Sequence, residues 1–259
     1  MGGTAAISIV PLSGLPMFAG GMSVAQELVT AAERAGEAIG DGDVVVVAQK
    51  IVSKAEGRVV ALGEVEVGED ARRLAAETGR EGGIAQLILD ESSEILRATP
   101  MAIIARHRTG HVLANAGIDA SNVEGGNSGA VLLWPRDPDV SARFIRGEIR
   151  RISGRNPAVV IADSMGRAWR VGTVGGAIGV AGIAALDDQR GQADLFGRTL
   201  QATIVAVADA VAGAAVLAMG EGAEGTPAAI VRGVSRWVSE DDGPGAIAAL
   251  RPVDQDMFR

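Results

Sequence analysis

The feature of this sequence that points most directly to chemistry is a carboxylate that follows a short apolar run. Residues 158–162 (Ala-Val-Val-Ile-Ala) are typical of a buried strand, and Asp163 and Ser164 come directly after them. Arg167 and Arg170 follow within the same segment. We expect Asp163 to leave the carboxyl end of the strand, where oxygen atoms can bind a cation and guanidinium groups can bind anions. A surface turn with a solvated ion pair is the alternative.

Lysine is rare in this chain. Of the 24 basic residues only Lys50 and Lys54 are lysines, and both follow a second apolar run at residues 44–48. Because arginine supplies the general basicity, a retained lysine indicates a site that needs a compact point charge, for example on a transferring phosphate. A position on a solvated face is the alternative reading.

Three acidic residues, Asp119, Asp163 and Glu221, follow apolar runs in segments that contain glycine. A few carboxylates together with phosphate oxygens suit a hard divalent cation. Taken singly, each acid is more simply explained as a helix cap or a solvated carboxylate. A metal site is therefore predicted only if the three converge.

Composition excludes several classes of function. The 24 basic and 32 acidic residues give a net charge of −8, which argues against nonspecific binding to nucleic acid or to an anionic membrane. The absence of cysteine excludes disulfides, thiolate metal sites and cysteine nucleophiles. The N-terminus resembles neither a signal peptide nor a myristoylation motif, so we expect a cytoplasmic protein. Neither Walker A, G-x-G-x-x-G nor G-x-S-x-G occurs, and His107 and His111 alone do not make a zinc site.

The order of the expected elements favours an α+β fold with mixed sheets and packed helices, because strands and helices alternate without a steady βαβ rhythm. Helices are expected over about residues 23–38, 70–78, 84–96, 140–152 and 203–219, and strands over residues 44–48, 103–105, 112–114 and 158–162. Two apolar stretches, 171–186 and 203–219, are too short or too polar to span a membrane. We expect one catalytic unit over residues 1–259. Whether residues of about 76–159 form a subdomain within it is left open.

Five motifs, taken in order, resemble those of the coenzyme F420-0:γ-glutamyl ligases, and the resemblance runs from about residue 12 to residue 233. The motifs are residues 14–16, 49–58, 116–123, 163–170 and 177–179. The resemblance implies a family-specific α+β fold, an intertwined homodimer and a nucleotide groove. It also implies that the C-terminal FMN-binding domain of fused relatives is absent from this chain.

The resemblance implies roles for residues at the matching positions. Asp119, Asp163 and Ser164, with Glu221 as a weaker candidate, would bind the metal. Our hypothesis from the charge of their side chains is that Lys54, Arg167 and Arg170 act in catalysis. The residues implied in GTP binding are Leu15, Pro16, Met17, Phe18, Gln49, Lys54, Asn122, Met219, Gly220, Glu221, Gly222, Ala223, Glu224, Gly225 and Thr226. Arg167 and Arg170 would take the phosphate or carboxylates of the substrate, although an internal pairing of Arg170 is left open.

The implied activity is the GTP-dependent joining of L-glutamate to F420-0, followed by γ-linked extension, with an acyl phosphate intermediate and release of GDP and phosphate. Mg²⁺ or Mn²⁺ and K⁺ are the implied ions. A carboxylate–amine ligase for another phosphorylated acid, or a nucleotide- or F420-binding homologue without turnover, are the alternatives. Gln49 and Val171 differ from the residues that are common at these positions in the family. These differences concern the identity of the acceptor and the number of glutamates added more than the ligase chemistry.

Overall fold

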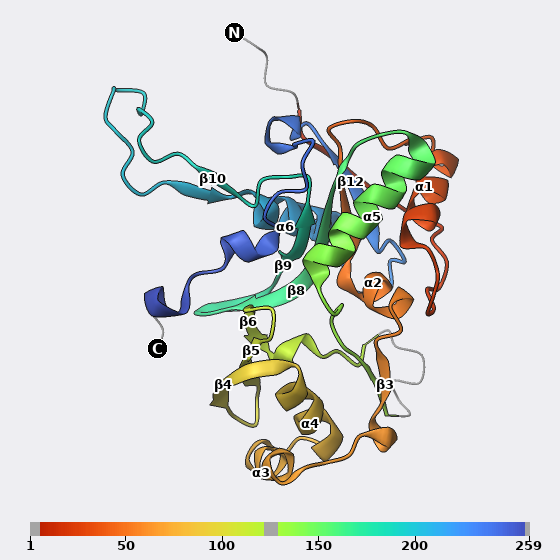
Figure 1. Ribbon diagram of the computed structural model, residues 1–259, viewed down its shortest axis with the longest axis vertical. Coiled ribbons are helices and arrows are strands. Elements are labelled where there is room, and N and C mark those ends of the chain that lie inside the picture. Colours follow the sequence, from red (N-terminus) through yellow and green to blue (C-terminus); the bar gives the residue numbers. More distant parts are fainter. Residues whose placement is uncertain (1–5, 122–128, 257–259) are drawn as a thin grey trace.

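A mixed five-stranded sheet forms the centre of the molecule in the computed structural model, which describes residues 6–121 and 129–256 (Figure 1). The strand order is β1 (Ser8–Pro11), β12 (Ala228–Arg232), β2 (Val44–Ala48), β8 (Ala158–Arg167) and β9 (Arg170–Ala181). Strands β2 and β8 are parallel, and the other neighbours are antiparallel. The mixed sheet and its helices confirm the predicted α+β class.

Helices cover both faces of this sheet (Figure 1). Helices α1 (Val24–Arg34) and α5 (Pro138–Ser153) pack on one face, and α6 (Val207–Met219) packs on the other. Successive residues of a strand point to opposite faces, so Val45 and Val47 enter the core under α1 and α5, and Val44 and Val46 enter the core under α6. Burial on both faces explains why β2 and the first half of β8 are unbroken apolar runs.

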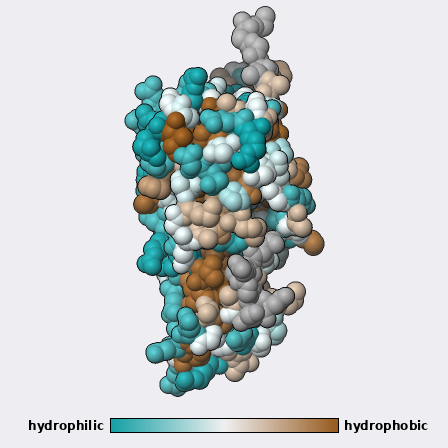
Figure 2. Space-filling model, turned by 90° about the vertical axis from the view of Figure 1, so that its right-hand side faces the viewer, coloured by the Kyte–Doolittle hydropathy of each residue, from teal (hydrophilic) through white to brown (hydrophobic). Residues whose placement is uncertain are grey.

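A smaller layer lies at the lower end of the molecule in Figure 1. It contains α3 (Glu69–Thr78), α4 (Gly82–Asp90) and a sheet of β4 (Ser92–Ala98), β5 (Ile103–His107) and β6 (Val112–Ala114), with a core of its own. Strand β3 (Val59–Ala61) pairs with β7 (Ala130–Leu132) beside it. On the face drawn in Figure 2, apolar residues gather at the height of this layer, whereas hydrophilic residues dominate the upper part.

Two elements complete the chain. Helix α2 (Gln49–Ala55) begins directly after β2, and the hairpin of β10 (Leu186–Asp188) and β11 (Ile204–Ala206) extends away from the body as a long arm (Figure 1). Short 3₁₀ turns link the remaining elements. No helix within the described ranges has the length and apolarity needed to cross a membrane.

The expected helix over residues 84–96 was wrong in its second half. Helix α4 ends at Asp90, and the chain continues as strand β4. The side chain of Glu91 at the helix end is almost fully buried, where it accepts bonds from two arginines. This buried ion cluster turns the chain out of the helix, and local periodicity does not contain that information.

The expectation that Asp163 stands at the end of a strand was also wrong. Strand β8 continues to Arg167 and returns as β9, with Asp163 opposite Gly176 and Ser164 opposite Gly175. Gly175 allows α6 to pack closely on the partner strand, because a Cβ there would lie 2.7 Å from the carbonyl oxygen of Ala212. The other expected strands and helices are present with shifted bounds, and residues 204–206 form β11 rather than the start of a helix.

Candidate active site

One part of the candidate site is an ion pair between helix α2 and the segment before β7. Helix α2 starts where β2 ends, so Lys50 lies just beyond the carboxyl end of the central strand. Its Nζ is 2.7 Å from Oδ2 of Asp119 and also donates to the hydroxyl of Ser121. Asp119 is held in place by a backbone bridge to Leu132 of β7. The two residues are 69 positions apart in sequence (119 minus 50), and the fold brings their charges into contact.

Asp119 is poised to remain ionised. Burial alone would raise its pKa, but the hydrogen bond from Lys50 and the backbone N–H of Ser121 outweigh burial and lower the pKa below its ordinary value. The Lys50 ammonium is thus the cation that neutralises this carboxylate in the structure. The sequence analysis did not select Lys50 as the partner of Asp119, and the role predicted for Lys54 on the nucleotide stays a prediction.

Asp163 faces the same region from β8. The indole Nε1 of Trp134 donates to its Oδ2 at 2.8 Å, and the backbone N–H of Ser164 donates to its Oδ1 at 2.9 Å. Burial raises the pKa of Asp163 to about 6; the two hydrogen bonds oppose this shift, and the charge of Asp119 adds to it. The mutual influence of Asp119, Lys50 and Asp163 shows that these three groups form one electrostatic cluster.

Trp134 fixes the position of Asp163 because its ring is tightly enclosed. It is fully buried, and Gly117 lies against it with a φ of +73°. A Cβ at Gly117 would lie 2.3 Å from the indole nitrogen, so only glycine allows this approach. Sequence analysis did not select Trp134, since nothing in a lone tryptophan after an apolar run distinguishes a carboxylate-holding role from a core role.

Ser164 points to the opposite face of the sheet from Asp163, as strand alternation requires. Its hydroxyl donates to Oε2 of Glu221, which lies just beyond the end of α6. The structure therefore brings Ser164 and Glu221 together as one pair. This pair is joined to the cluster of Lys50, Asp119 and Asp163 through the peptide between Asp163 and Ser164.

The donor atoms of this region suit a hard divalent cation. Two carboxylates approach closely enough for the charge of one to shift the pKa of the other, which a cation between them would relieve. Among the described residues, however, no group of three or more acidic or histidine side chains is arranged to hold a metal ion by itself. A metal bound here would need further oxygen ligands from a phosphate-bearing substrate or from water.

The residues expected to contact GTP near the N-terminus lie beside α2. Leu15 is partly buried and Phe18 is buried in the core under α1, whereas Pro16 and Met17 are exposed. The backbone N–H of Gly21, three residues further on, donates to the carbonyl of Ala55 at the end of α2, which holds this loop against the helix that carries Lys50 and Lys54. The loop therefore lies beside the two lysines.

Gln49 is buried, and its Nε2 donates to the hydroxyl of Ser53 at 2.6 Å, while its Oε1 has no hydrogen-bond partner among the described residues. Lys54 stands one helical turn after Lys50, so the two project from the same face of α2. Asn122 lies outside the described residues.

The late turn follows α6 directly. Met219 belongs to the core, the hydroxyl of Thr226 donates to its carbonyl at 2.6 Å, and the Glu224 carboxylate accepts the N–H of Gly222 at 2.8 Å. The residues between them, Gly220, Glu221, Ala223 and Gly225, are exposed or partly exposed. The turn is thus closed at its base and places Glu221 beside Ser164.

Arg167 and Arg170 are not brought into the cluster. They pair across the tip of the β8–β9 hairpin, where both are exposed. Arg167 is four residues beyond Asp163, and at about 3.3 Å per strand residue this corresponds to about 13 Å. Within the described part of the chain, neither side chain makes an ion pair or a hydrogen bond.

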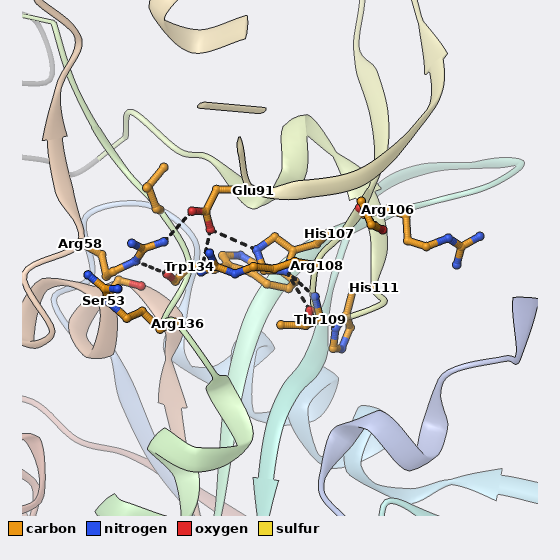
Figure 3. Close-up of polar contacts among 12 residues, drawn as sticks. Ser53, Arg58, Glu91, Arg106, His107, Arg108, Thr109, His111, Trp134 and Arg136 are labelled. Atoms are coloured by element: carbon orange, nitrogen blue, oxygen red, sulfur yellow. Dashed lines mark hydrogen bonds and ion pairs between the residues drawn. The ribbon is translucent and has the colours of Figure 1, made fainter. Parts of the chain in front are cut away.

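A buried polar network missed by the sequence analysis surrounds Trp134 (Figure 3). Glu91 accepts from Arg58 at 2.9 Å and Arg108 at 3.0 Å, and its Oε2 is 3.4 Å from Nε2 of His107. Thr109 links His107 to His111 through contacts of 2.8 and 2.9 Å. The imidazole rings of the two histidines lie 4.9 and 5.4 Å from the Trp134 ring. The segment 106–111 contains the only two histidines of the chain, and this clustering is the sequence feature from which the network could have been predicted.

Comparison with known families now gives the class of protein. The family model described as F420-0:gamma-glutamyl ligase matches residues 14–233, which cover most of the chain and include every segment of the acidic cluster. The chain therefore belongs to the F420-0:gamma-glutamyl ligase family, as the ordered motifs indicated.

Three relatives that share one name are similar to this chain over nearly its whole length. The chain is 43% identical over 253 residues to the coenzyme F420:L-glutamate ligase of Methanothermobacter thermautotrophicus, covering 98% of this chain and 99% of that protein. It is 41% identical to the enzyme of the same name from Methanopyrus kandleri, over the full length of both chains. It is 42% identical to that of Archaeoglobus fulgidus, over 98% of this chain and 96% of the relative.

Proposed function

We propose that this protein is a ligase that joins L-glutamate to coenzyme F420-0 by an amide bond and then adds γ-linked glutamates, with GTP as the energy source. The observation that carries the proposal is the convergence of Lys50, Asp119 and Asp163 from three separated segments in a chain of this family. The names of the full-length relatives support the choice of coenzyme F420 and glutamate as substrates.

The reaction that we propose has two steps. The γ-phosphoryl group of GTP passes to the acceptor carboxylate, which gives an acyl phosphate and GDP. The amine of glutamate then attacks the acyl carbon, loses a proton, and releases phosphate. Lys50 and Lys54, on one face of α2, would neutralise charge on the phosphoryl oxygens, because an ammonium aimed at a developing negative charge lowers the barrier. The loop of residues 15–18 and the turn of residues 219–226 would hold the nucleotide.

Asp119 and Asp163 are the residues that would hold Mg²⁺ or Mn²⁺ in this proposal. Ser164 and Glu221 pair with each other on the opposite face of the sheet, so their side chains do not share a site with these two carboxylates. The bound cation would supply charge neutralisation on phosphate oxygens. Trp134 orients Asp163 through its indole N–H, and the backbone bridge to Leu132 orients Asp119. The implied K⁺ has no ligand set assigned to it.

The direct test of the proposed function is one incubation of the purified protein with F420-0, GTP, L-glutamate and Mn²⁺, read by mass spectrometry. We expect products that are heavier by one glutamyl residue and then by further glutamyl residues, with one GDP per bond. A panel of other phosphorylated acids in place of F420-0 tests the related carboxylate–amine ligases. Binding of GTP without any GDP release in the complete mixture would contradict the proposal and favour a homologue without turnover.

We also propose that the protein is a homodimer, because its two protruding hairpins end in apolar side chains. Leu195 and Phe196 on the β10–β11 arm are 100% and 90% exposed, and Trp169 at the β8–β9 tip is 90% exposed. Large apolar side chains gathered on extended arms are typical of surfaces that a partner covers.

Replacement of Phe196 by aspartate tests the homodimer. We expect Phe196→Asp to elute as a monomer where the unchanged chain elutes as a dimer, measured by size-exclusion chromatography with light scattering, because a charge on a covered apolar contact carries a desolvation cost. Met101→Asp is the matched control, since Met101 is 90% exposed in the turn before β5 and lies on neither arm. A dimer that survives in Phe196→Asp would place the interface elsewhere.

A further inference from the structure

A second polar site lies next to His111, outside the cluster of Lys50, Asp119 and Asp163. A cavity of about 390 Å³ opens between the start of α5, the turn before β6 and the segment 244–247. Its volume lies in the range of pockets that bind small molecules. The residues that line it include three arginines in a chain of net charge −8, namely Arg108, Arg136 and Arg143.

The positive charge of this cavity is largely available to a ligand. Within the described ranges, the side chains of Arg136 and Arg143 form no hydrogen bond and no ion pair, although Arg143 is half-buried. Arg108 forms an ion pair with Glu91, and Glu91 also forms an ion pair with Arg58. Two unpaired guanidinium groups facing one cavity form a site for two carboxylates, because each guanidinium can bind one carboxylate through a pair of hydrogen bonds.

The cavity has two carboxylates, of which Asp139 is used in hydrogen bonds within the protein and Asp137 has an oxygen atom free to bind a ligand. Asp139 is occupied, because it accepts the backbone N–H groups of Val180 and Ala246 at 2.8 and 2.7 Å. Asp137 uses only Oδ1, to cap α5 through the N–H of Val140, and its Oδ2 has no partner among the described residues. A free carboxylate oxygen beside two free guanidinium groups is the pattern expected for a ligand that carries an ammonium group as well as carboxylates.

His111 belongs to the same wall but offers no open polar atom to a ligand. Its Nδ1 lies 2.9 Å from the hydroxyl of Thr109, and its Nε2 is buried. The polar groups of the cavity that a ligand can reach are therefore the arginines and Asp137.

We infer that this cavity binds the amino-acid substrate, an α-amino dicarboxylate, with Arg136 and Arg143 on its carboxylates and with Asp137 on its amine; the inference rests on the proposed function for the identity of that substrate as L-glutamate. Two side chains connect the cavity to the acidic cluster. His111 lines the cavity and contacts the ring of Trp134 (Figure 3), and the indole nitrogen of Trp134 donates to Asp163.

The test uses the full chain and separates glutamate from the other substrates. We expect Arg143→Met to raise both the KM for L-glutamate and the Kd from equilibrium dialysis with radiolabelled L-glutamate by at least about tenfold, because it removes a charge-assisted pair of bonds. KM values for GTP and F420-0 should stay close to those of the unchanged chain. Arg143→Lys should give an intermediate loss, and Arg136→Met provides a second variant of the same kind.

Arg150→Met is the matched control, because it removes one positive charge from the exposed face of the same helix, two turns further along and outside the cavity. An unchanged Kd and KM for glutamate in both Arg143→Met and Arg136→Met would overturn the inference and leave the ligase function intact. An increase confined to the KM of F420-0 would overturn it as well. Glutamate binding that is lost in Arg143→Met, in a chain that forms no amide bond, would support the site and contradict the proposed function.

Discussion

Replacement of Asp163 by asparagine is expected to abolish ligation while the protein stays folded. Asparagine keeps an oxygen that can accept the indole N–H of Trp134, so the packing around it is preserved. It removes the negative charge that the proposed reaction needs next to Asp119, and the loss of such an electrostatic group lowers turnover by about 100-fold or more. The measurement is GDP release and glutamyl-product formation in the complete assay.

The stability of the same variant gives a second readout. Burial raises the pKa of Asp163 to about 6 from its ordinary 3.8, so the ionised carboxylate destabilises the folded state at pH values above 6. Asparagine cannot ionise, so Asp163→Asn should melt at the same or a higher temperature than the unchanged chain at pH 8 in the presence of a chelator. The difference should shrink as the pH falls from about 6 towards 4, where the native carboxyl takes up its proton.

Asp187→Asn is a matched control for this prediction. Asp187 also accepts an indole N–H, from Trp237 at 3.3 Å, but it lies on β10 outside the acidic cluster. Its replacement should leave ligation unchanged. Full activity in Asp163→Asn, or an equal loss in Asp187→Asn, would remove Asp163 from the proposed mechanism.

The second large effect is expected at Lys50. Its ammonium lies 2.7 Å from Asp119 and competes for the carboxylate that we assign to the metal. Lys50→Met should therefore bind Mn²⁺ more tightly in the absence of nucleotide, by about tenfold, because the carboxylate loses its internal counter-ion. Ligation should nevertheless fall by about 100-fold, because the ammonium no longer neutralises the phosphoryl oxygens. Mn²⁺ titration followed by electron paramagnetic resonance and the ligation assay measure the two effects separately.

Lys54→Met, one turn further along the same helix, is the comparison variant. If Lys54 acts on the nucleotide alone, its replacement should raise the KM for GTP and leave the Mn²⁺ affinity of the nucleotide-free protein unchanged. Weaker Mn²⁺ binding in Lys50→Met would show that Lys50 supports the metal site and does not compete with it.

Much of the framework could be predicted from local patterns. The valine run of β2 and the apolar first half of β8 identify strands that are buried on both faces, because such strands lack the alternation of half-exposed ones. Ser23 before α1 and the αL glycine after α5 mark the ends of helices through capping chemistry that involves only neighbouring residues. The ordered motifs likewise indicated the family, and Asp119 and Asp163 were selected because carboxylates after buried strands can bind cations.

The tertiary structure decided what short-range patterns do not encode. The pairing of Lys50 with Asp119 depends on which turn of α2 the segment of Asp119 packs against, and both lysines satisfy the sequence argument equally. The placement of Glu91, the hold of Trp134 on Asp163 and the cavity with Arg136 and Arg143 likewise arise from contacts between distant segments. Sequence periodicity reports which face of an element is buried, whereas the charges that meet in the site are set by how separate elements pack. The elements and the family could therefore be predicted from the sequence, and the contacts between site residues could not.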